Sequence, residues 1–392
     1  MSETPASLIL AQLRASVLER LRELRRDEGV SVGNAVTYLQ DGDEAYPMML
    51  AAIASAERSV HLETYIFDPD SVGGRFLRAL AAAARAGVSV RLVVDAVGSY
   101  RMSASDLEYV RRAGVRVHVF NPIRVAPFEL LSRRNHRKLL VVDGRVAFVG
   151  GMNISADHVP PPMGRGWRDS LVCIEGPAVT HLDASFARIN TKDNAEEAAV
   201  PATLATPAAL DGRVRVLWNN WYARRYAIRD SYLRHIGRAE RSITFAHSYF
   251  VPDGKMRRAL KKALERGVKI RLLLPGLSDV PIVKRAMEAF YAKYLELGIE
   301  VREWPGAMMH MKVAVFDDAH FTIGSYNLDH RSLRKNLEVA LWISQTPCIE
   351  KLMQNLAVDW QASVAITQEK WVRRTWLARV REWVAFRLRK SF

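Results

Sequence analysis

The feature that most constrains this chain is a short segment that occurs twice. Both copies read His-x-Lys-x-x-x-x-Asp, followed by an apolar stretch and then by Gly-(Gly/Ser)-x-Asn. The matching positions are His136, Lys138, Asp143 and Asn153 in the first copy, and His310, Lys312, Asp317 and Asn327 in the second. The apolar residues on either side of each Asp are typical of two buried strands joined by a tight turn. Because side chains alternate along a strand, the His and Lys of each copy face the same side.

Other landmarks recur in the same order, which indicates an internal duplication. The tetrapeptide at 56–59 (Ala-Glu-Arg-Ser) returns at 239–242, and Tyr65-Ile66-Phe67 is answered by Tyr249-Phe250-Val251. Fewer residues separate the two motif histidines than separate the two tetrapeptides along the chain. The second half therefore lacks most of an insertion at 123–134.

Helical and apolar strand patterns alternate in each half, which favours an α/β fold. In the first half the expected elements are a helix at 45–56, a strand at 59–67, a helix at 75–86, a strand at 88–94, a helix at 105–113 and a strand at 115–120. A further helix is expected at 350–364. The duplication predicts two α-β-α sandwich lobes related by a pseudo-twofold axis.

The expected domain organisation has five parts. They are an N-terminal amphipathic helix at 1–30, a first lobe at 31–195, a linker rich in Ala, Pro and Thr at 196–212, a second lobe at 213–365 and a basic, Trp-rich tail at 366–392. A length of 392 residues suits two domains with sizeable cores.

The formal net charge of +15 points to an anionic partner, which could be nucleic acid, lipid headgroups or a phosphorylated substrate. The chain has two cysteines, Cys173 and Cys348, which make no disulfide framework and fit a cytoplasmic location. No signal peptide and no stretch near the ~20 apolar residues of a membrane span is present. We therefore expect any contact with a membrane to be peripheral.

Two His-Lys pairs brought together can transfer a phosphoryl-type group. A neutral imidazole is a nucleophile toward phosphorus, and the opposite imidazolium can protonate a leaving alkoxide. Lys138 and Lys312 would neutralise the non-bridging oxygens, so the site needs no metal. Further donors to those oxygens are expected from Asn153, Asn327 and Ser325.

Each histidine also needs a partner that fixes its tautomer. Asp169 follows His136 by 33 residues and Glu338 follows His310 by 28, each just before an apolar run, and we expect these two acids to orient the rings. A single His-x-Lys on a strand is more often an exposed face or a satisfied histidine. Two copies at equivalent places favour catalysis. A metal site at His136, His310 and Asp143 is disfavoured because a lysine two residues away would repel the cation.

The paired segments resemble the two HKD motifs of the phospholipase D superfamily. The stretch at 324–329 (Gly-Ser-Tyr-Asn-Leu-Asp), with 331–333, Asn336 and Glu338, is similar to the second motif of bacterial cardiolipin synthases, and the shorter, span-free type is the best match. The resemblance covers about 36–356. It implies two lobes sharing one site, a covalent phosphohistidine intermediate on His136 with His310 as the acid, and no metal or other cofactor.

The resemblance also implies the reaction, which is transfer of a phosphatidyl group from one phosphatidylglycerol to another with release of glycerol. It places Asp143 and Asp317 in the motif's catalytic set, whereas their position in a turn favours a structural role. A phospholipase D that uses water as acceptor is the alternative. A superfamily nuclease would also suit the charge, but such nucleases are commonly short one-motif chains, so no nucleic acid is expected. A non-enzymatic membrane scaffold would not need both pairs.

The tail suggests how the chain meets a lipid surface, on the cytoplasmic side of the cell membrane. On a helical projection Val372, Trp376, Val380, Trp383 and Val384 share one face, with arginines opposite. Trp and Arg together are typical of a helix lying among headgroups. The alternative is an ordinary terminal helix packed on the body. The sequence leaves the oligomeric state open.

Overall fold

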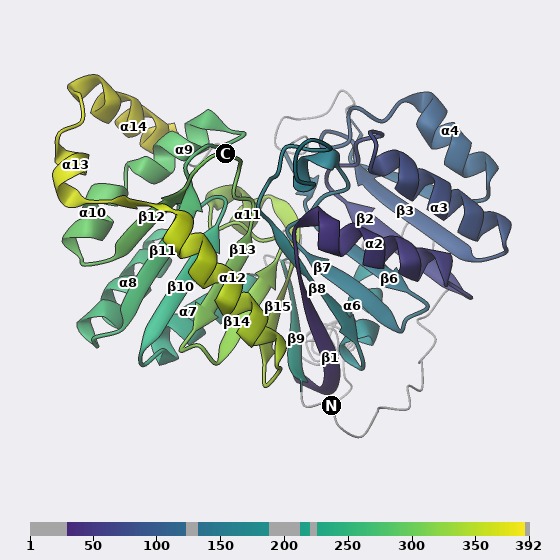
Figure 1. The fold of residues 1–392 in the computed structure, drawn as a ribbon, viewed down its shortest axis with the longest axis horizontal. Helices are drawn as coiled ribbons and strands as arrows, with labels where there is room; N and C mark the ends of the chain where they lie inside the picture. The colour runs from purple at the N-terminus through teal and green to yellow at the C-terminus, as the bar shows by residue number, and fades with distance from the viewer. Residues whose placement is uncertain (1–29, 123–131, 188–211, 220–225, 389–392) are drawn as a thin grey trace, which may run out of the picture.

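The computed structural model describes residues 30–122, 132–187, 212–219 and 226–388, and within them the two halves build one continuous sheet (Figure 1). The predicted N-terminal helix and nearly all of the linker and the insertion lie outside the described residues. From the centre outward, the first half contributes β1 (Val30–Gln40), β8 (Ser170–Glu175), β7 (Val146–Gly150), β6 (Leu139–Val142), β2 (Ser59–Thr64), β3 (Ser89–Asp95) and β4 (Arg116–Phe120).

The second half runs outward in the same order. Its strands are β9 (Gly212–Asn219), β15 (Asn336–Ser344), β14 (His320–Gly324), β13 (Lys312–Phe316), β10 (Ser242–His247), β11 (Lys269–Pro275) and β12 (Glu300–Trp304), with β16 (Val364–Ile366) at the edge. In each half the two outer pairs of this common set are parallel and the inner ones antiparallel. At the centre β1 pairs antiparallel with β9, so the halves meet edge to edge.

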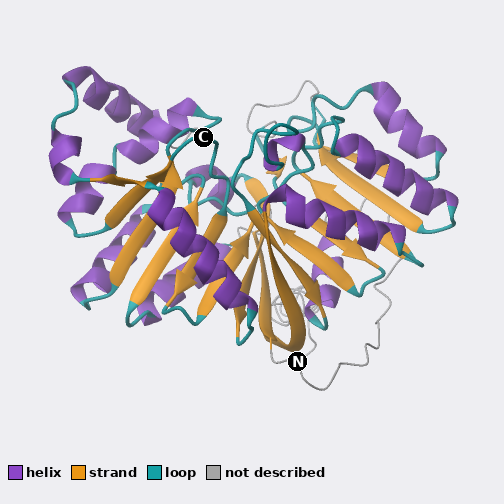
Figure 2. Cartoon of the chain, in the orientation of Figure 1, coloured by secondary structure: helices purple, strands orange, loops and turns teal. Residues whose placement is uncertain are grey.

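Helices cover both faces of the sheet (Figure 2). They are α2 (Asp41–Ala54), α3 (Gly73–Arg85), α4 (Ala104–Arg112), α6 (Ala178–Ala187), α7 (Ala227–Arg238), α8 (Gly254–Glu265), α9 (Pro281–Glu288), α10 (Tyr291–Glu296), α11 (His330–Arg334), α12 (Cys348–Ala362), α13 (Gln368–Val372) and α14 (Trp376–Leu388). Local chemistry sets their starts. Ser103 and Asp106 form a reciprocal capping box on α4, and Asp253 caps α8.

The two halves share part of their apolar core. One apolar cluster lies in each outer region, and a third, at the centre, contains Val149 and Val172 of the first half with Met311 and Val339 of the second. The strands that carry the repeated motif contribute to this shared core. The α/β architecture is as predicted, and the elements of the first half begin and end within a few residues of their expected positions.

The tail differs from its prediction. It forms two helices, α13 and α14, in place of one continuous amphipathic helix. Trp371 of α13 packs against Tyr291, with ring centroids 4.9 Å apart, and Phe386 of α14 packs edge-on against Phe290 at 5.3 Å. The chain therefore fastens its C-terminal region to the second half through aromatic contacts.

Candidate active site

Both His-x-Lys segments lie where the two halves meet. His136 precedes β6 and donates its backbone N–H to the carbonyl of Leu337 at 3.0 Å. His310 precedes β13 and donates in the same way to the carbonyl of Arg168 at 2.6 Å. Each histidine is therefore held by a main-chain group of the opposite half.

The two acids predicted to orient the histidines each contact a histidine, but the pairs are crossed between halves. Nδ1 of His136 lies 3.1 Å from both carboxylate oxygens of Glu338, and Nδ1 of His310 lies 2.7 Å from Oδ2 of Asp169. Sequence spacing had associated each acid with the histidine that precedes it. A carboxylate on Nδ1 keeps the ring proton there and leaves the Nε2 lone pair for a substrate.

The lysines of the motif are buried beside the histidines. Nζ of Lys138 donates to the carbonyl of His136 at 2.7 Å, and Nζ of Lys312 donates to the carbonyl of His310 at 2.5 Å. Burial lowers the pKa of Lys138 to about 7 and that of Lys312 to about 8, against the attraction of nearby carboxylates such as Glu338 and Asp169. An anion that enters the site would restore their full charge.

Burial likewise holds both imidazoles neutral. It lowers the pKa of His136 to about 4, although the Glu338 carboxylate opposes the shift, and it lowers the pKa of His310 well below its ordinary value. Lys312, Lys138 and His136 each contribute to the shift of His310, so these groups interact within one site. A neutral imidazole is the form that attacks phosphorus.

The motif aspartates lie in the turn that ends β6 and β13, beyond the strand from the histidines. The carboxylate of Asp143 accepts the backbone N–H groups of residues 57–59 at 2.7–2.9 Å, and Asp317 accepts those of residues 240–242 at 2.7–3.2 Å. These donors belong to the repeated Ala-Glu-Arg-Ser tetrapeptide, which explains why it recurs. Asp143 and Asp317 therefore each hold a turn, because their carboxylates are occupied by these backbone donors.

The three expected phosphate donors divide into two kinds. Oδ1 of Asn153 accepts the N–H of Ile66 at 3.2 Å, and Oδ1 of Asn327 accepts the hydroxyl of Ser248 at 2.8 Å, which leaves each amide nitrogen to serve as a donor. The hydroxyl of Ser325 donates instead to Glu338 at 2.5 Å. Because a hydroxyl has one proton, Ser325 positions the carboxylate in this structure and does not donate to a phosphate.

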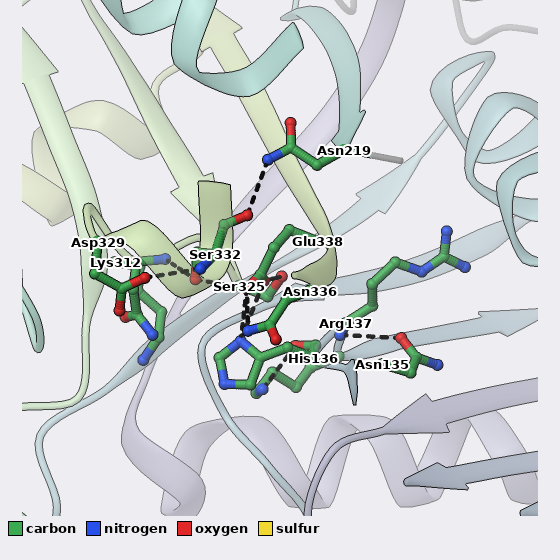
Figure 3. Close-up of polar contacts among 12 residues, drawn as sticks. Asn135, His136, Arg137, Asn219, Lys312, Ser325, Asp329, Ser332, Asn336 and Glu338 are labelled. Atoms are coloured by element: carbon green, nitrogen blue, oxygen red, sulfur yellow. Dashed lines mark hydrogen bonds and ion pairs between the residues drawn. The ribbon is translucent and has the colours of Figure 1, made fainter. Parts of the chain in front are cut away.

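Glu338 collects further donors from its own half (Figure 3). The hydroxyl of Ser332 donates to Oε1 at 2.7 Å, and the amide of Asn336 donates to the same oxygen at 3.1 Å. His136, Lys138 and the hydroxyl of Ser325 lower the pKa of the Glu338 carboxyl in spite of its burial. Ser332 and Asn336 lie in the stretch that resembles the second motif, but no role was predicted for them.

Asp169 is held from both halves by a neighbouring ion cluster that sequence reasoning missed. The guanidinium of Arg168 lies 2.5 Å from Asp41 of α2 and 2.8 Å from Asp359 of α12. The backbone N–H of Asp169 donates to Asp41 at 2.8 Å. No sequence spacing pointed to this cluster, because its members lie far apart along the chain.

One group of described side chains has the composition of a metal site. Ligand atoms of His158, Asp169 and His310 lie within 4.8 Å of one another. Nε2 of His158, however, accepts the backbone N–H of Asn153 at 3.3 Å, and Lys312 interacts electrostatically with Asp169. These neighbours oppose a divalent cation there.

Known proteins carry the same sequence pattern. The family model described as cardiolipin synthase, PLD-like domain, matches residues 49–190 and 232–360. The chain belongs to this family. It is 32% identical over 378 residues to cardiolipin synthase B of Escherichia coli, covering 92% of this chain and 89% of that protein. It is 34% identical over 362 residues to a cardiolipin synthase of Geobacillus kaustophilus, covering 91% and 72%.

Solved structures support the fold of this family. Phosphatidylserine synthase of Haemophilus influenzae matches with a TM-score of 0.66 and 13% identity, over 94% of this chain and 96% of that one. Polyphosphate kinase of Porphyromonas gingivalis matches with a TM-score of 0.57 and 17% identity, over 85% and 49%. At these identities the likeness concerns the fold and not the reaction.

Proposed function

We propose that this protein is a cardiolipin synthase that transfers a phosphatidyl group from one phosphatidylglycerol to another. The observation that carries the proposal is the pair of crossed His–carboxylate contacts, His136 with Glu338 and His310 with Asp169, beside two buried lysines. The relatives named as cardiolipin synthases support the choice of substrate.

The first step forms a covalent intermediate. Nε2 of His136 attacks the phosphorus of the donor lipid, and the bond from phosphorus to the headgroup glycerol breaks. His310, protonated on Nε2 once the anionic substrate is bound, gives that proton to the departing alkoxide, so glycerol leaves neutral. Lys138 and Lys312 neutralise the non-bridging oxygens throughout.

The second step reverses the proton transfer. His310 takes the proton from a headgroup hydroxyl of the second phosphatidylglycerol, and that oxygen attacks the phosphorus. The bond from phosphorus to His136 then breaks, which releases cardiolipin and regenerates the free imidazole. If water enters in place of the alcohol, the product is phosphatidic acid.

The deciding experiment uses purified protein and vesicles of phosphatidylglycerol. Cardiolipin, phosphatidic acid and free glycerol are measured together. Cardiolipin and glycerol formed in equal amounts support the synthase. Phosphatidic acid with glycerol, and no cardiolipin, would make the protein a phospholipase D.

We also propose that the protein works as a peripheral protein on the cytoplasmic side of the membrane, through helix α14. No helix in the described part of the chain is long and apolar enough to cross a bilayer. One side of α14 packs on the body through buried Ala385 and partly buried Phe386. Glu382 on α14 pairs with Arg374, in the turn that joins α13 to α14. Figure 1 places α14 beside α9 at the edge of the second half.

The other side of α14 is apolar and exposed. Trp376 is 70% exposed and Trp383 is 60% exposed, and they are joined by further exposed apolar residues, Leu377, Val380, Val384 and Leu388. At 100° per residue this arc is roughly 140° wide, with Arg379 and Arg381 at its edges and exposed Arg387 within it. The guanidinium of Arg387 lies 5.4 Å from the ring of Trp383. Indoles with flanking cations suit an anionic headgroup layer.

Substitution tests this contact better than deletion of the tail. Removing 368–392 would also uncover Tyr291 and Phe290 of the core, which Trp371 and Phe386 cover. The double variant Trp376→Gln/Trp383→Gln should bind phosphatidylglycerol vesicles several-fold more weakly and keep its activity on detergent-dispersed lipid. Val358→Gln, at a residue of α12 that is also 60% exposed, is the matched control. Unchanged vesicle binding in the double variant would exclude this surface.

A further inference from the structure

The two orienting acids are supported by different side chains at equivalent positions. The backbone N–H of Gly151 donates to the carbonyl of Ser170 at 3.0 Å, and that of Ser325 donates to the carbonyl of Val339 at 2.9 Å. These contacts align Asp169 with Glu338 across the pseudo-symmetry. They also align Gly151 with Ser325, and seven residues later His158 with Ser332.

In the second half, two serines reach Glu338. Ser325 donates to Oε2, and Ser332 donates to Oε1 while its oxygen accepts the backbone N–H of Asn327 at 3.3 Å. Ser332 therefore links the backbone of Asn327 to the carboxylate of Glu338. In the first half the acid is one methylene shorter, and neither serine is present.

Gly151 and Asp169 fit each other sterically. A Cβ atom on Gly151 would lie 2.3 Å from Oδ1 of Asp169, which is closer than any real contact. The shorter carboxylate thus occupies the space that the side chain of Ser325 fills in the other half. A serine at 151 could not donate to it without moving the acid.

His158 occupies the place of Ser332 and makes the same first contact. Its Nε2 accepts the backbone N–H of Asn153 at 3.3 Å, so the ring proton is on Nδ1. Nδ1 lies 3.6 Å from Oδ2 of Asp169, the oxygen that also accepts from His310. His158 is fully buried, and its Nδ1 has no hydrogen-bond partner among the described residues. A buried N–H group without a hydrogen bond costs free energy, and this one lies just beyond bonding distance of a carboxylate.

The neighbours of the His158 ring leave Asp169 as the acceptor nearest to this N–H group. The ring of Trp167 lies 5.6 Å from that of His158 and 5.5 Å from that of His310, between centroids. The groups that act electrostatically on His158 are Asp169, His310 and the two motif lysines, Lys312 and Lys138. Burial lowers the pKa of His158 to about 3, so the ring is a neutral donor at neutral pH.

We propose that His158 is a positioning residue for His310, which supports the Asp169 carboxylate as Ser332 supports Glu338. When His310 gives up its proton, the Asp169 carboxylate loses the positive charge beside it. The 3.6 Å between Nδ1 of His158 and Oδ2 of Asp169 then shortens to a hydrogen bond. The inference rests on the proposed acid–base role of His310. Each half then has its own matching set of three residues at equivalent positions. The first half has Gly151, His158 and Asp169, and the second has Ser325, Ser332 and Glu338.

The electrostatics set the sign of the expected change. Burial raises the pKa of Asp169, while Lys312 and His158 act against it. Without the N–H of His158, the carboxylate binds a proton more readily and attracts the imidazolium of His310 more strongly. Both effects raise the proton affinity of the Asp169–His310 pair.

The test compares His158→Phe, which keeps a flat ring without either nitrogen, with His158→Gln, which offers an acceptor and a donor on one planar group. The kcat of the Phe variant should fall about ten-fold with little change in KM. The acidic limb of its pH–rate profile should move to higher pH. The Gln variant should keep the wild-type limb. A uniform fall in rate without a shift of the limb would overturn the positioning role, provided that thermal unfolding shows both variants folded.

A second readout does not depend on cardiolipin formation. In the resting protein, NMR of ¹⁵N-labelled histidine should find the His158 proton on Nδ1, with the signal assigned by its loss in His158→Gln. A proton on Nε2 would overturn the inference whatever the reaction proves to be. The pH profile is measured on whichever headgroup-releasing reaction the wild type performs. Failure of the synthase proposal and failure of this one therefore remain distinguishable.

Discussion

Nδ1 of His136, in the first half, lies 3.1 Å from Oε1 of Glu338, in the second half, where the halves meet through β1 and β9. His310 and Asp169 form the reverse contact at 2.7 Å. Each of the two imidazole rings is therefore held by a carboxylate of the half to which it does not belong. Neither half contains a histidine with its acid, so the duplication makes one site and not two.

The crossed contacts predict which acid serves which histidine. Glu338→Gln keeps the shape of the side chain but removes the charge that supports an imidazolium at His136. We expect kcat to fall by about 10³-fold or more, as when a buried orienting acid becomes an amide elsewhere, with little change in lipid binding. Asp169→Asn should act similarly through His310.

The matched control is Glu57→Gln, because that carboxylate is exposed and pairs only loosely with Arg145 at 4.0 Å. Its activity should equal that of the wild type. If Glu338→Gln and Asp169→Asn also turn over normally, other groups hold the rings.

The two histidines should differ in the adduct they carry. His136→Ala and His310→Ala should each abolish turnover with the fold intact, because both side chains lie at the joint and contribute to none of the three apolar clusters. Quenching the wild type during turnover and mapping the phosphatidyl group by mass spectrometry should find it on His136. An adduct on His310 would reverse the assignment of nucleophile and acid.

The lowered lysine pKa values predict how substrate binding depends on pH. In the free protein the pKa of Lys138 is about 7 and that of Lys312 about 8, so both lose charge between pH 7 and pH 9. Deacylated phosphatidylglycerol is a phosphodiester whose own charge is constant over this range. Its affinity, measured by calorimetry, should fall as pH rises from 7 to 9, and binding near pH 8 should take up protons from the buffer.

The exposed Lys351, which pairs with Glu44, provides the control for that experiment. Lys351→Ala should show the same pH dependence as the wild type. A pH-independent affinity in the wild-type protein would mean that the motif lysines keep their full charge in the free site.

Much of this fold could be predicted because its signals are local. The His-x-Lys spacing, the apolar strands and the repeated tetrapeptide each report on a few consecutive residues. The crossed pairing could not be predicted. Asp169 and Glu338 each follow a histidine by similar distances, and which ring each one reaches depends on how β1 meets β9. His158 gave no signal either, since its role appears only when its surroundings are compared with those of Ser332.

The tail combines both alternatives that its sequence left open. Periodicity identified an apolar face, and Trp376, Val380, Trp383 and Val384 of that face are exposed as expected. Periodicity did not indicate that Ala385 and Phe386, on another side of the helix, fasten it to the body, because that contact depends on Phe290 at a remote position.

Activity should be independent of divalent metal. Lys138 and Lys312 supply the positive charge that a cation supplies in other phosphoryl-transfer sites. The measurement is cardiolipin formation with and without excess EDTA after dialysis. A loss that Mg²⁺ or Zn²⁺ restores would contradict this, and the group formed by His158, Asp169 and His310 would be the place to look for the ion.

Arg168 offers the sharpest test of the joint between the halves. Its guanidinium neutralises Asp41 and the almost fully buried Asp359, and its carbonyl accepts the N–H of His310. Burial already raises the pKa of both carboxyls against the attraction of Arg168.

Arg168→Ala leaves Asp41 and Asp359 unpaired and should lower the free energy of unfolding by about 3 kcal/mol at pH 7. Carboxyls whose folded-state pKa is raised destabilise the fold when ionised, and that cost disappears as they bind protons. The loss measured by urea denaturation should therefore be smaller at pH 5 than at pH 7. The double variant Asp41→Asn/Asp359→Asn, combined with Arg168→Ala, should recover stability at pH 7. Its kcat should stay low, because the arginine that held residue 41 against the backbone of Asp169 is gone. An equal loss at both pH values would mean that the arginine stabilises the joint by packing and not by charge.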